Sequence, residues 1–116
     1  MSDACRIAVV TGATSGIGRA IVPALRALGL TVYAIGRNEA QLADLAGATG
    51  AIPVQADVRD TARIAGALAG VEVDILVNNA GILSTRAAFQ DIDPAEIDAL
   101  IDVNLQAPLH LTRVVL

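Results

Sequence analysis

A chain of 116 residues is long enough for one small domain and too short for two. Hydrophobic residues make up 54% of it and aromatic residues only 2%, so a core must be built from Ala, Val, Ile and Leu. That composition is typical of a parallel sheet covered on both faces, and it excludes disordered and disulfide-stapled proteins. The net charge is -4, and the basic residues, all of them arginines, form no basic run, which argues against a nucleic-acid surface.

The predicted cellular setting is the cytoplasm. Cys5 is the single cysteine, which excludes an internal disulfide. No charged-then-apolar leader opens the chain, and no apolar stretch reaches the ~18 residues that a membrane span requires. A single histidine, a single cysteine and scattered carboxylates give a metal site little support. We therefore expect a cytoplasmic protein without a metal, membrane or nucleic-acid partner.

Strands and helices are predicted to alternate along the chain. The strands are short apolar runs over residues 6–10, 31–35, 52–55 and 74–78. The helices have apolar residues at helical spacing and cover residues 16–28, 39–45, 61–68 and 94–116. Loops are expected over residues 47–50 and 82–89. The predicted inward face of the first helix consists of Ile17, Ile21, Ala24, Leu25 and Leu28.

Particular residues refine these elements. Asp60 is a candidate cap for the third helix, and Asp93 followed by Pro94 has the residue types of a helix start. Pro108 is expected to interrupt the last helix, because proline removes a backbone donor. Pro53 indicates that the third strand lies at an edge of the sheet.

Alternating strands and helices imply right-handed βαβ units and a parallel sheet. A third strand at the edge corresponds to the order 3-2-1-4. The predicted fold class is therefore α/β, a Rossmann-like, doubly wound sheet in a three-layer sandwich. Residues 1–116 would form one dinucleotide-binding domain that is incomplete at its C-terminus.

The most informative stretch is residues 11–18, which read T-G-A-T-S-G-I-G between the first predicted strand and helix. Gly12 is expected to make the tight turn, Gly16 to let a pyrophosphate approach the backbone, and Gly18 to pack the helix on the strand. Backbone N–H groups at the helix start would meet the phosphates. The alternative is a plain turn. The candidate phosphate-binding residues are Gly12, Thr14, Ser15, Gly16, Ile17 and Gly18.

Candidate ligand-binding residues also follow the other strands, at the same edge of the sheet. Arg37 suits the 2′-phosphate of NADP(H), whereas a carboxylate there would favour NAD(H); the alternative is a solvated loop charge. Asp57 could accept a bond from adenine with help from the Val58 backbone, or it could be a plain loop carboxylate. The turn after the fourth strand could cross under the cofactor or be a simple turn. Its candidate residues are Asn79, Ala80 and Gly81.

Asn104 lies in an apolar helical stretch, where a side chain that competes for backbone bonds is unfavourable. It needs a partner there, either functional or structural. Tyr33, the sole tyrosine, falls in the second predicted strand, and the chain contains no lysine.

Together these residues resemble the short-chain dehydrogenase/reductase family in its compact, single-domain branch. The resemblance rests on residues 11–18, Asp57 with Val58, N-N-A-G at residues 78–81, and Asn104 within D-V-N. It implies that the glycine loop binds pyrophosphate, Asp57 contacts adenine, and N-N-A-G adjoins the nicotinamide ribose. It also implies that Asn104 is the Asn of a catalytic Ser, Tyr, Lys and Asn tetrad, where it helps to hold a proton-relay water.

The function implied is an NADP(H)-dependent oxidoreductase that interconverts an alcohol and a carbonyl, with NAD(H) as a possible cofactor. Ser15 departs from the basic residue that many NADP(H)-dependent members carry before the second glycine. The family's catalytic Ser and Tyr-x-x-x-Lys lie downstream of its Asn and have no counterpart here. We therefore expect the 116 residues alone to have no catalytic activity. We expect the N-terminal half of a longer, homo-oligomeric enzyme, a dimer or tetramer, that acts on a small alcohol or carbonyl compound.

Two alternatives stay open. One is a dinucleotide-binding module without catalysis. The other is a family member with different chemistry, such as epimerisation or dehydration, although the spacing of the first two glycines argues mildly against the epimerase-like branch. Ser84, Thr85, Arg86 and Phe89 are candidates for the border of a substrate pocket.

Overall fold

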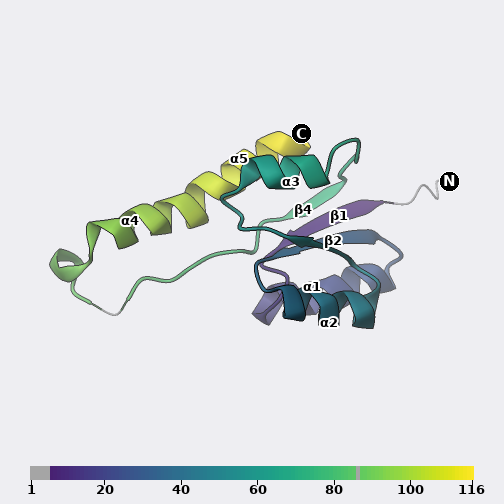
Figure 1. Cartoon of the computed structure of the whole chain (residues 1–116), viewed down its shortest axis with the longest axis horizontal. Helices are drawn as coiled ribbons and strands as arrows, with labels where there is room; N and C mark the ends of the chain where they lie inside the picture. The colour runs from purple at the N-terminus through teal and green to yellow at the C-terminus, as the bar shows by residue number, and fades with distance from the viewer. Residues whose placement is uncertain (1–5, 86) are drawn as a thin grey trace.

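The four predicted strands form one parallel sheet in the order β3-β2-β1-β4 (Figure 1). The computed structural model describes residues 6–85 and 87–116. Its strands are β1 (Ile7–Thr11), β2 (Thr31–Gly36), β3 (Ile52–Gln55) and β4 (Ile75–Val77). In the central register, Val9 of β1 lies between Tyr33 of β2 and Leu76 of β4. The predicted fold class and strand order are confirmed.

Helices cover both faces of the sheet and complete the predicted three-layer sandwich. On one face lie α1 (Gly16–Ala27) and α2 (Glu39–Thr49), and on the other lie α3 (Thr61–Ala67) and α5 (Ala107–Val115) (Figure 1). This arrangement follows from short parallel strands that are apolar on both faces and need cover on each side.

The core consists of two apolar clusters separated by the sheet. Successive side chains of a strand point to opposite faces, so Ala8 and Val10 of β1 join one cluster whereas Val9 joins the other. Val22 of α1 packs in the first cluster and Ile64 of α3 in the second, and neither is exposed. The predicted core of small aliphatic residues is therefore split into two thin layers.

The predicted inward face of α1 is partly wrong. Ile17 is 72% exposed and Leu28 is 76% exposed, whereas Gly18 and Val22 are buried. Gly18 lets the start of α1 approach the strand layer closely, and Val22 follows one turn later on the same face. Ile17 consequently lies at the rim of the contact instead of within it.

Capping residues set the helix starts, and the predicted caps are confirmed. The side chain of Asp60 accepts a hydrogen bond from Arg63 N at 3.2 Å, and that of Asp93 accepts one from Ala95 N at 2.9 Å. Asn38, which the sequence analysis did not single out, caps α2 by accepting from Gln41 N at 2.9 Å.

Three predicted boundaries change. The helix expected to end near Leu45 continues to Thr49, because Gly47 is tolerated on its exposed face and Gly50 is the true C-cap. The fourth strand covers Ile75–Val77 and is shorter than residues 74–78, although Asp74 N donates to Ile7 O at 2.8 Å and the Asp74 side chain accepts a bond from Ile7 N. The loop after it ends before Phe89, where a short 3-10 helix begins.

Pro53 lies in the edge strand, as predicted, opposite Ala34 of β2. Ala56 N donates to Gly36 O at 2.9 Å, so the backbone N–H groups two and four residues earlier face β2 as well. The nitrogen of Pro53 therefore faces the outer side of the sheet, where no ladder bond is lost.

Residues 82–85 and 87–106 form an extension that we call the arm, which reaches away from the sandwich (Figure 1). It contains η1 (Phe89–Asp91), α4 (Pro94–Ile101) and the π-helical turn η2 (Asp102–Gln106), and the molecule is 55 Å long along its main axis. Among residues 6–85 and 87–116, no helix combines the length and apolar character needed to cross a membrane.

The predicted interruption of the last helix is confirmed, but it precedes Pro108. Ala107 N donates to Asp102 O, five residues back, and α5 begins at Ala107 with Pro108 in its first turn. Proline has no N–H group to donate to the carbonyl of Asn104 four residues earlier, so the helix widens over the turn before it. Asn104 therefore lies in a π-helical turn and not in a regular α-helix.

Candidate functional site

Thr11 joins the ends of β1 and β4. Its side chain is 1% exposed, and its Oγ1 accepts hydrogen bonds from Asn79 N and Ala80 N, both at 3.0 Å. The same hydroxyl lies 3.4 Å from Val77 O, to which it donates. A buried hydroxyl at the end of a strand thereby fixes the turn after β4 beside the turn after β1.

The glycine loop between β1 and α1 has the backbone geometry that its sequence predicts. Gly12 has a φ of +60°, and a Cβ there would lie 2.9 Å from Ala80 Cα. Gly16 has a φ of +57° with open space where a Cβ would point. Both torsions lie in the left-handed region, so other residues would be strained. The open space at Gly16 is a place where a ligand can reach the backbone.

Gly18 is the position of closest approach between α1 and the strand ends. A Cβ there would overlap Gly12 O and the Asn79 side chain. Asn79 Nδ2 donates to that same Gly12 oxygen at 3.2 Å. Gly18 therefore has the packing position that the sequence predicts, and Asn79 supports the loop through the Gly12 carbonyl.

The start of α1 faces the solvent at this loop. Ser15 makes no side-chain cap bond, and the first turn of α1 holds no acidic residue. The first N–H groups of a helix have no partner within it, and they form the positive end of its dipole. An anion with several oxygens would be stabilised there by backbone dipoles alone.

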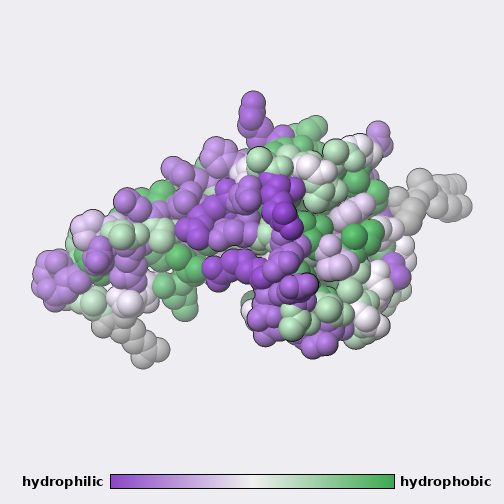
Figure 2. Space-filling view, in the orientation of Figure 1, coloured by the Kyte–Doolittle hydropathy of each residue, from purple (hydrophilic) through white to green (hydrophobic). Residues whose placement is uncertain are grey.

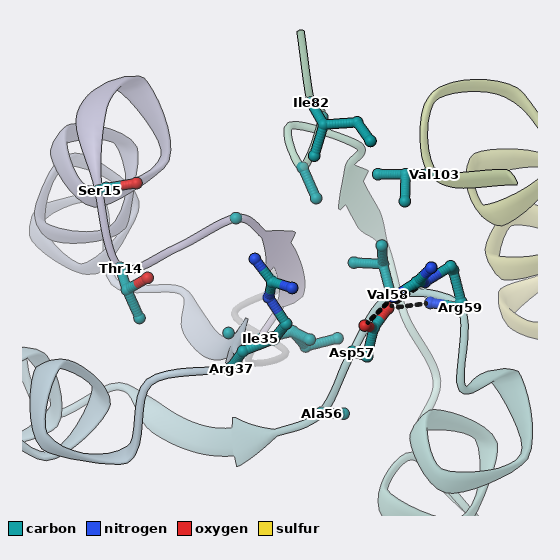
Figure 3. Close-up of a pocket in the computed structure, with 14 residues that line it drawn as sticks. Thr14, Ser15, Ile35, Arg37, Ala56, Asp57, Val58, Arg59, Ile82 and Val103 are labelled. Carbon is teal, nitrogen blue, oxygen red and sulfur yellow. Dashed lines mark hydrogen bonds and ion pairs between the residues drawn. The ribbon is translucent and has the colours of Figure 1, made fainter. Parts of the chain in front are cut away.

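A hollow opens above the carboxyl ends of β1, β2 and β3, and Figure 3 shows the side chains around it. We call it the strand-end hollow. Most of the predicted ligand-binding residues line it, together with six that were not predicted, Ile35, Gly36, Ala56, Arg59, Ile82 and Val103. The predicted lining residues are Gly12, Thr14, Ser15, Arg37, Asp57, Val58, Ala80 and Gly81.

Arg37 follows β2 directly, and its guanidinium projects into the strand-end hollow (Figure 3). Its backbone carbonyl accepts a bond from Gln55 Nε2 at 3.3 Å, which ties it to β3. Within the described part of the chain, no hydrogen bond or ion pair occupies the guanidinium itself. Gly36 precedes it because a Cβ there would lie 2.6 Å from Thr14 Cγ2.

Asp57 is held by Arg59, a residue that the sequence analysis missed. Arg59 Nε donates to Asp57 Oδ1 at 3.0 Å and Arg59 NH2 donates to Oδ2 at 2.8 Å. The Arg59 backbone N–H also donates to Oδ1 at 2.9 Å. The Arg59 side-chain bond lowers the pKa of Asp57 from 3.8 to about 2, with a smaller contribution from Arg37, although partial burial opposes the shift. The bond to Asp57 likewise raises the pKa of Arg59.

Asn104 does not line the strand-end hollow, but it fixes a residue that does. Its Oδ1 accepts from Ile82 N and its Nδ2 donates to Ile82 O, both at 2.8 Å. The two bonds imitate a strand pairing between one side chain and one backbone unit. Its neighbour Val103 is 7% exposed and lines the hollow. The partner that the sequence required for Asn104 is therefore the backbone of the segment after β4.

The remaining candidates lie apart from the strand-end hollow. Ile17 points to the solvent, and Phe89 is 77% exposed on the arm. Thr85 is held by Glu96, whose carboxylate oxygens accept from its N–H and its hydroxyl at 2.6 and 3.1 Å. Ser84 is exposed, and Arg86 lies outside the described residues.

Two missed residues carry recognisable signals. Thr11 is a polar residue that ends a fully apolar strand, and a buried hydroxyl must have partners. Arg59 lies two residues after Asp57 in the turn that follows β3, within reach of its carboxylate. Ile82 and Val103 carry none, because only the path of the arm brings them to the hollow.

Known proteins match this chain along nearly all of its length. A family model for the short chain dehydrogenases matches residues 6–116. An uncharacterized short-chain type dehydrogenase/reductase of Sinorhizobium fredii is 46% identical over 110 residues, which cover 95% of this chain and 44% of that protein. D-beta-hydroxybutyrate dehydrogenase of Cupriavidus necator is 40% identical over 122 residues, covering 96% of this chain and 46% of that enzyme.

A solved structure agrees with these relatives. The crystal structure of a metagenomic short-chain oxidoreductase in complex with NADP has a TM-score of 0.87 at 38% identity, covering 94% of this chain and 54% of that one. The chain spans about half the length of the curated relatives it matches. Since the family model matches nearly every residue and the strand order and glycine loop agree with it, the chain belongs to the short-chain dehydrogenase family.

Proposed function

We propose that these residues form the cofactor-binding part of an NADP(H)-dependent oxidoreductase that interconverts an alcohol and a carbonyl. The observation that supports this most directly is the strand-end hollow, which joins an open helix start to Arg37, whose guanidinium has no partner among the described residues. The printed names of the relatives are those of dehydrogenases and reductases, and one related structure holds NADP.

The glycine loop suits a pyrophosphate. Gly16 leaves the backbone open to a ligand, and the start of α1 offers N–H groups and a positive dipole end. Gly12, Gly18 and Asn79 keep the loop in this shape through close packing and one hydrogen bond. No lysine is needed, because dipoles meet the charge.

The far side of the hollow suits an adenosine that carries a 2′-phosphate. The guanidinium of Arg37 after β2 pairs with no residue of 6–85 or 87–116, and its planar fork can take two phosphate oxygens. Asp57 and Val58 line the hollow after β3, and we assign them to the adenine ring. Ala80 and Gly81 line the opposite end, and we assign them with Asn79 to the nicotinamide ribose.

A bound nicotinamide would supply or accept the hydride. Carbonyl reduction also requires a proton donor close to the forming alkoxide. Asn104 contributes to that half of the site by holding the Ile82 backbone beside the hollow. The sequence has no lysine and its one tyrosine lies in β2, so we propose that the proton donor belongs to residues outside these 116.

The alternative is a module that binds dinucleotides without catalysis. It predicts the same cofactor affinities and no turnover with any alcohol or carbonyl in the longest native form of the protein. Turnover of NADPH with a carbonyl compound would exclude it.

Isothermal titration of the purified protein with NADPH and NADH tests the proposed cofactor. Arg37→Asp should weaken NADPH binding relative to NADH by roughly 10- to 100-fold, because a charge-assisted fork is replaced by a like charge. Arg113→Asp makes the same charge change on the exposed side of α5 and should leave the ratio unchanged. Equal losses for both cofactors in Arg37→Asp would contradict a 2′-phosphate role, and wild-type protein that binds neither would contradict the proposal.

A further inference from the structure

The Asp57 carboxylate lies between two arginines at the strand-end hollow. Figure 3 shows Arg37 on one side of it and Arg59 on the other, with dashed lines only to Arg59. The two arginines are unequal partners, because Arg59 engages both carboxylate oxygens while Arg37 acts on Asp57 only through its charge. Arg59 is therefore paired with Asp57, whereas the Arg37 guanidinium has no partner among the described residues.

A bare carboxylate at this position would oppose the proposed cofactor. Asp57 and Arg37 both line the same hollow, so a 2′-phosphate bound by Arg37 would lie near the Asp57 charge. Two like charges repel each other, and the carboxylate would also compete with the phosphate for the Arg37 guanidinium. A second positive group must therefore compensate the charge of Asp57, so that the Arg37 guanidinium stays available for the phosphate.

We propose that Arg59 is a positioning residue that sets the preference for a cofactor with a 2′-phosphate, by pairing with Asp57 and thereby leaving Arg37 free for the phosphate. This inference rests on the proposed function. It gives Arg59 an indirect role, because Arg59 acts through Asp57 and does not itself contact the phosphate.

The hydrogen-bond count supports this assignment. Oδ1 of Asp57 accepts two bonds, from the backbone N–H and Nε of Arg59, whereas Oδ2 accepts one bond from NH2. A carboxylate has about four lone-pair sites, so one site on Oδ2 stays open. Arg59 thus fixes which lone pair Asp57 can offer to the adenine amino group while it compensates the charge.

The surroundings of Arg59 support the indirect role. Its other side faces the groove beneath the arm, which Asp98, Asp102 and Gln106 line. Asp102 acts on Arg59 through its charge. Arg59 lines the same hollow as Arg37, but its guanidinium is engaged by Asp57 and attracted by Asp102. Figure 2 shows hydrophilic side chains gathered where the arm meets the sandwich.

Binding ratios test the proposal without any catalytic step. The dissociation constants of NADPH and NADH are measured by titration calorimetry for the wild type, Arg59→Gln, Asp57→Asn and the double variant. Both cofactors carry the same adenine, so their ratio cancels any change in adenine binding. In Arg59→Gln we expect the preference for NADPH to fall about 5-fold, because an uncompensated carboxylate faces the phosphate.

The double variant provides the sharpest test. Asp57→Asn removes the carboxylate that Arg59 compensates, so Asp57→Asn with Arg59→Gln should restore the wild-type preference to within about 2-fold. Asp57→Asn alone should keep or raise that preference. Arg113→Gln, an exposed arginine on α5 outside the hollow, is the matched control and should not change it. Arg59 is exposed, so these variants should keep the far-UV circular dichroism of the wild type.

Other outcomes overturn the inference. If Arg59→Gln keeps the wild-type ratio, Arg59 has no influence on the phosphate. If the double variant keeps the low ratio of Arg59→Gln, Arg59 contacts the phosphate directly and is not a positioning residue. In both cases the wild type still prefers NADPH, so the proposed function stands. If the wild-type protein does not prefer NADPH over NADH, the proposed NADP(H) preference is wrong, and the inference about Arg59 is wrong with it.

Discussion

The sandwich and the arm are built on different principles. In the sandwich, Ala8, Val9 and Val10 of β1 are completely buried, because helices pack on both faces. In the arm, α4 has no buried residue, and Val103 is the buried residue of η2. The arm is held instead by side-chain hydrogen bonds, two between Asn104 and the Ile82 backbone and two that Thr85 donates to the Glu96 carboxylate.

This difference between buried packing and exposed hydrogen bonds indicates which half of the candidate site is preorganised. The side proposed to bind pyrophosphate and adenosine rests on buried packing, which a whole-domain core stabilises. The side that Asn104 fixes rests on a few exposed hydrogen bonds, each worth only about 1 kcal/mol. We therefore expect local opening of the arm to occur far more often than opening of the glycine loop.

The largest effect is expected where the sandwich is tightest. Gly18→Ala places a methyl group against Gly12 O and the Asn79 side chain, and the backbone oxygen cannot move without distorting the loop. We expect the free energy of unfolding to fall by about 3 kcal/mol in urea denaturation.

Gly47→Ala is the matched control for that substitution. Gly47 lies on the exposed side of α2 with nothing near its missing Cβ. Alanine there should stabilise the protein by about 0.5–1 kcal/mol, because it restricts the unfolded chain and favours the helix. Similar losses in both variants would contradict the close packing described at Gly18.

A smaller and local effect is expected in the arm. Asn104→Ala removes both bonds to Ile82, so the Ile82 amide should exchange with deuterium about 10-fold faster. The amides of β1 should be unaffected, since the sandwich does not depend on the arm.

Gln106→Ala serves as the control, because Gln106 is exposed in the same π-helical turn. It should leave the exchange of Ile82 unchanged. Faster exchange throughout β1 in Asn104→Ala would show instead that the arm and sandwich unfold together.

The smallest effect concerns pH at the boundary between the two regions. The folded-state pKa of Asp57 is about 2 and its ordinary value is 3.8, so the ion pair stabilises the folded state above the ordinary value. That stabilisation is lost as the pH falls through this interval. The pair is partly exposed, so its contribution should not exceed about 1 kcal/mol.

The unfolding free energies of the wild type and Asp57→Asn should therefore differ at about pH 5 and converge only below about pH 2, where Asp57 is protonated in the folded state as well. Arg59 and Arg37 are the charges that act on Asp57 directly, and Asp102 acts on Arg59. All other carboxylates titrate in both proteins, so the difference isolates Asp57. A difference that stays constant over this range would contradict the shifted pKa.

The sequence predicted the sandwich better than the arm, for physical reasons. The strand order was predicted from the alternation of apolar runs with helical spacing and from Pro53, which indicated an edge strand. These are local sequence patterns that determine the topology of the whole sheet. The same local signals failed at Gly47, because an exposed helical glycine costs only about 1 kcal/mol and the helix continues.

The candidate site was predictable where residues directly follow strands, as Arg37 and Asp57 do. The pair between Asp57 and Arg59 needed the turn geometry, and the contact of Asn104 with Ile82 needed the path of the arm. Asn104 and Ile82 are 22 positions apart, so no periodicity in the sequence indicates their contact. Pro108 signalled an irregular helix, but not that the π-helical turn precedes it.

The proline in β3 also affects how the protein behaves at high concentration. The outer edge of a sheet is a template on which a strand of another molecule can add, and such pairing propagates into aggregates. β3 is a strand of four residues, and the backbone nitrogen that faces outward at Pro53 carries no hydrogen. An added strand would find a gap in the middle of its ladder. This edge therefore resists intermolecular β-pairing even though Ile52 beside it is partly exposed.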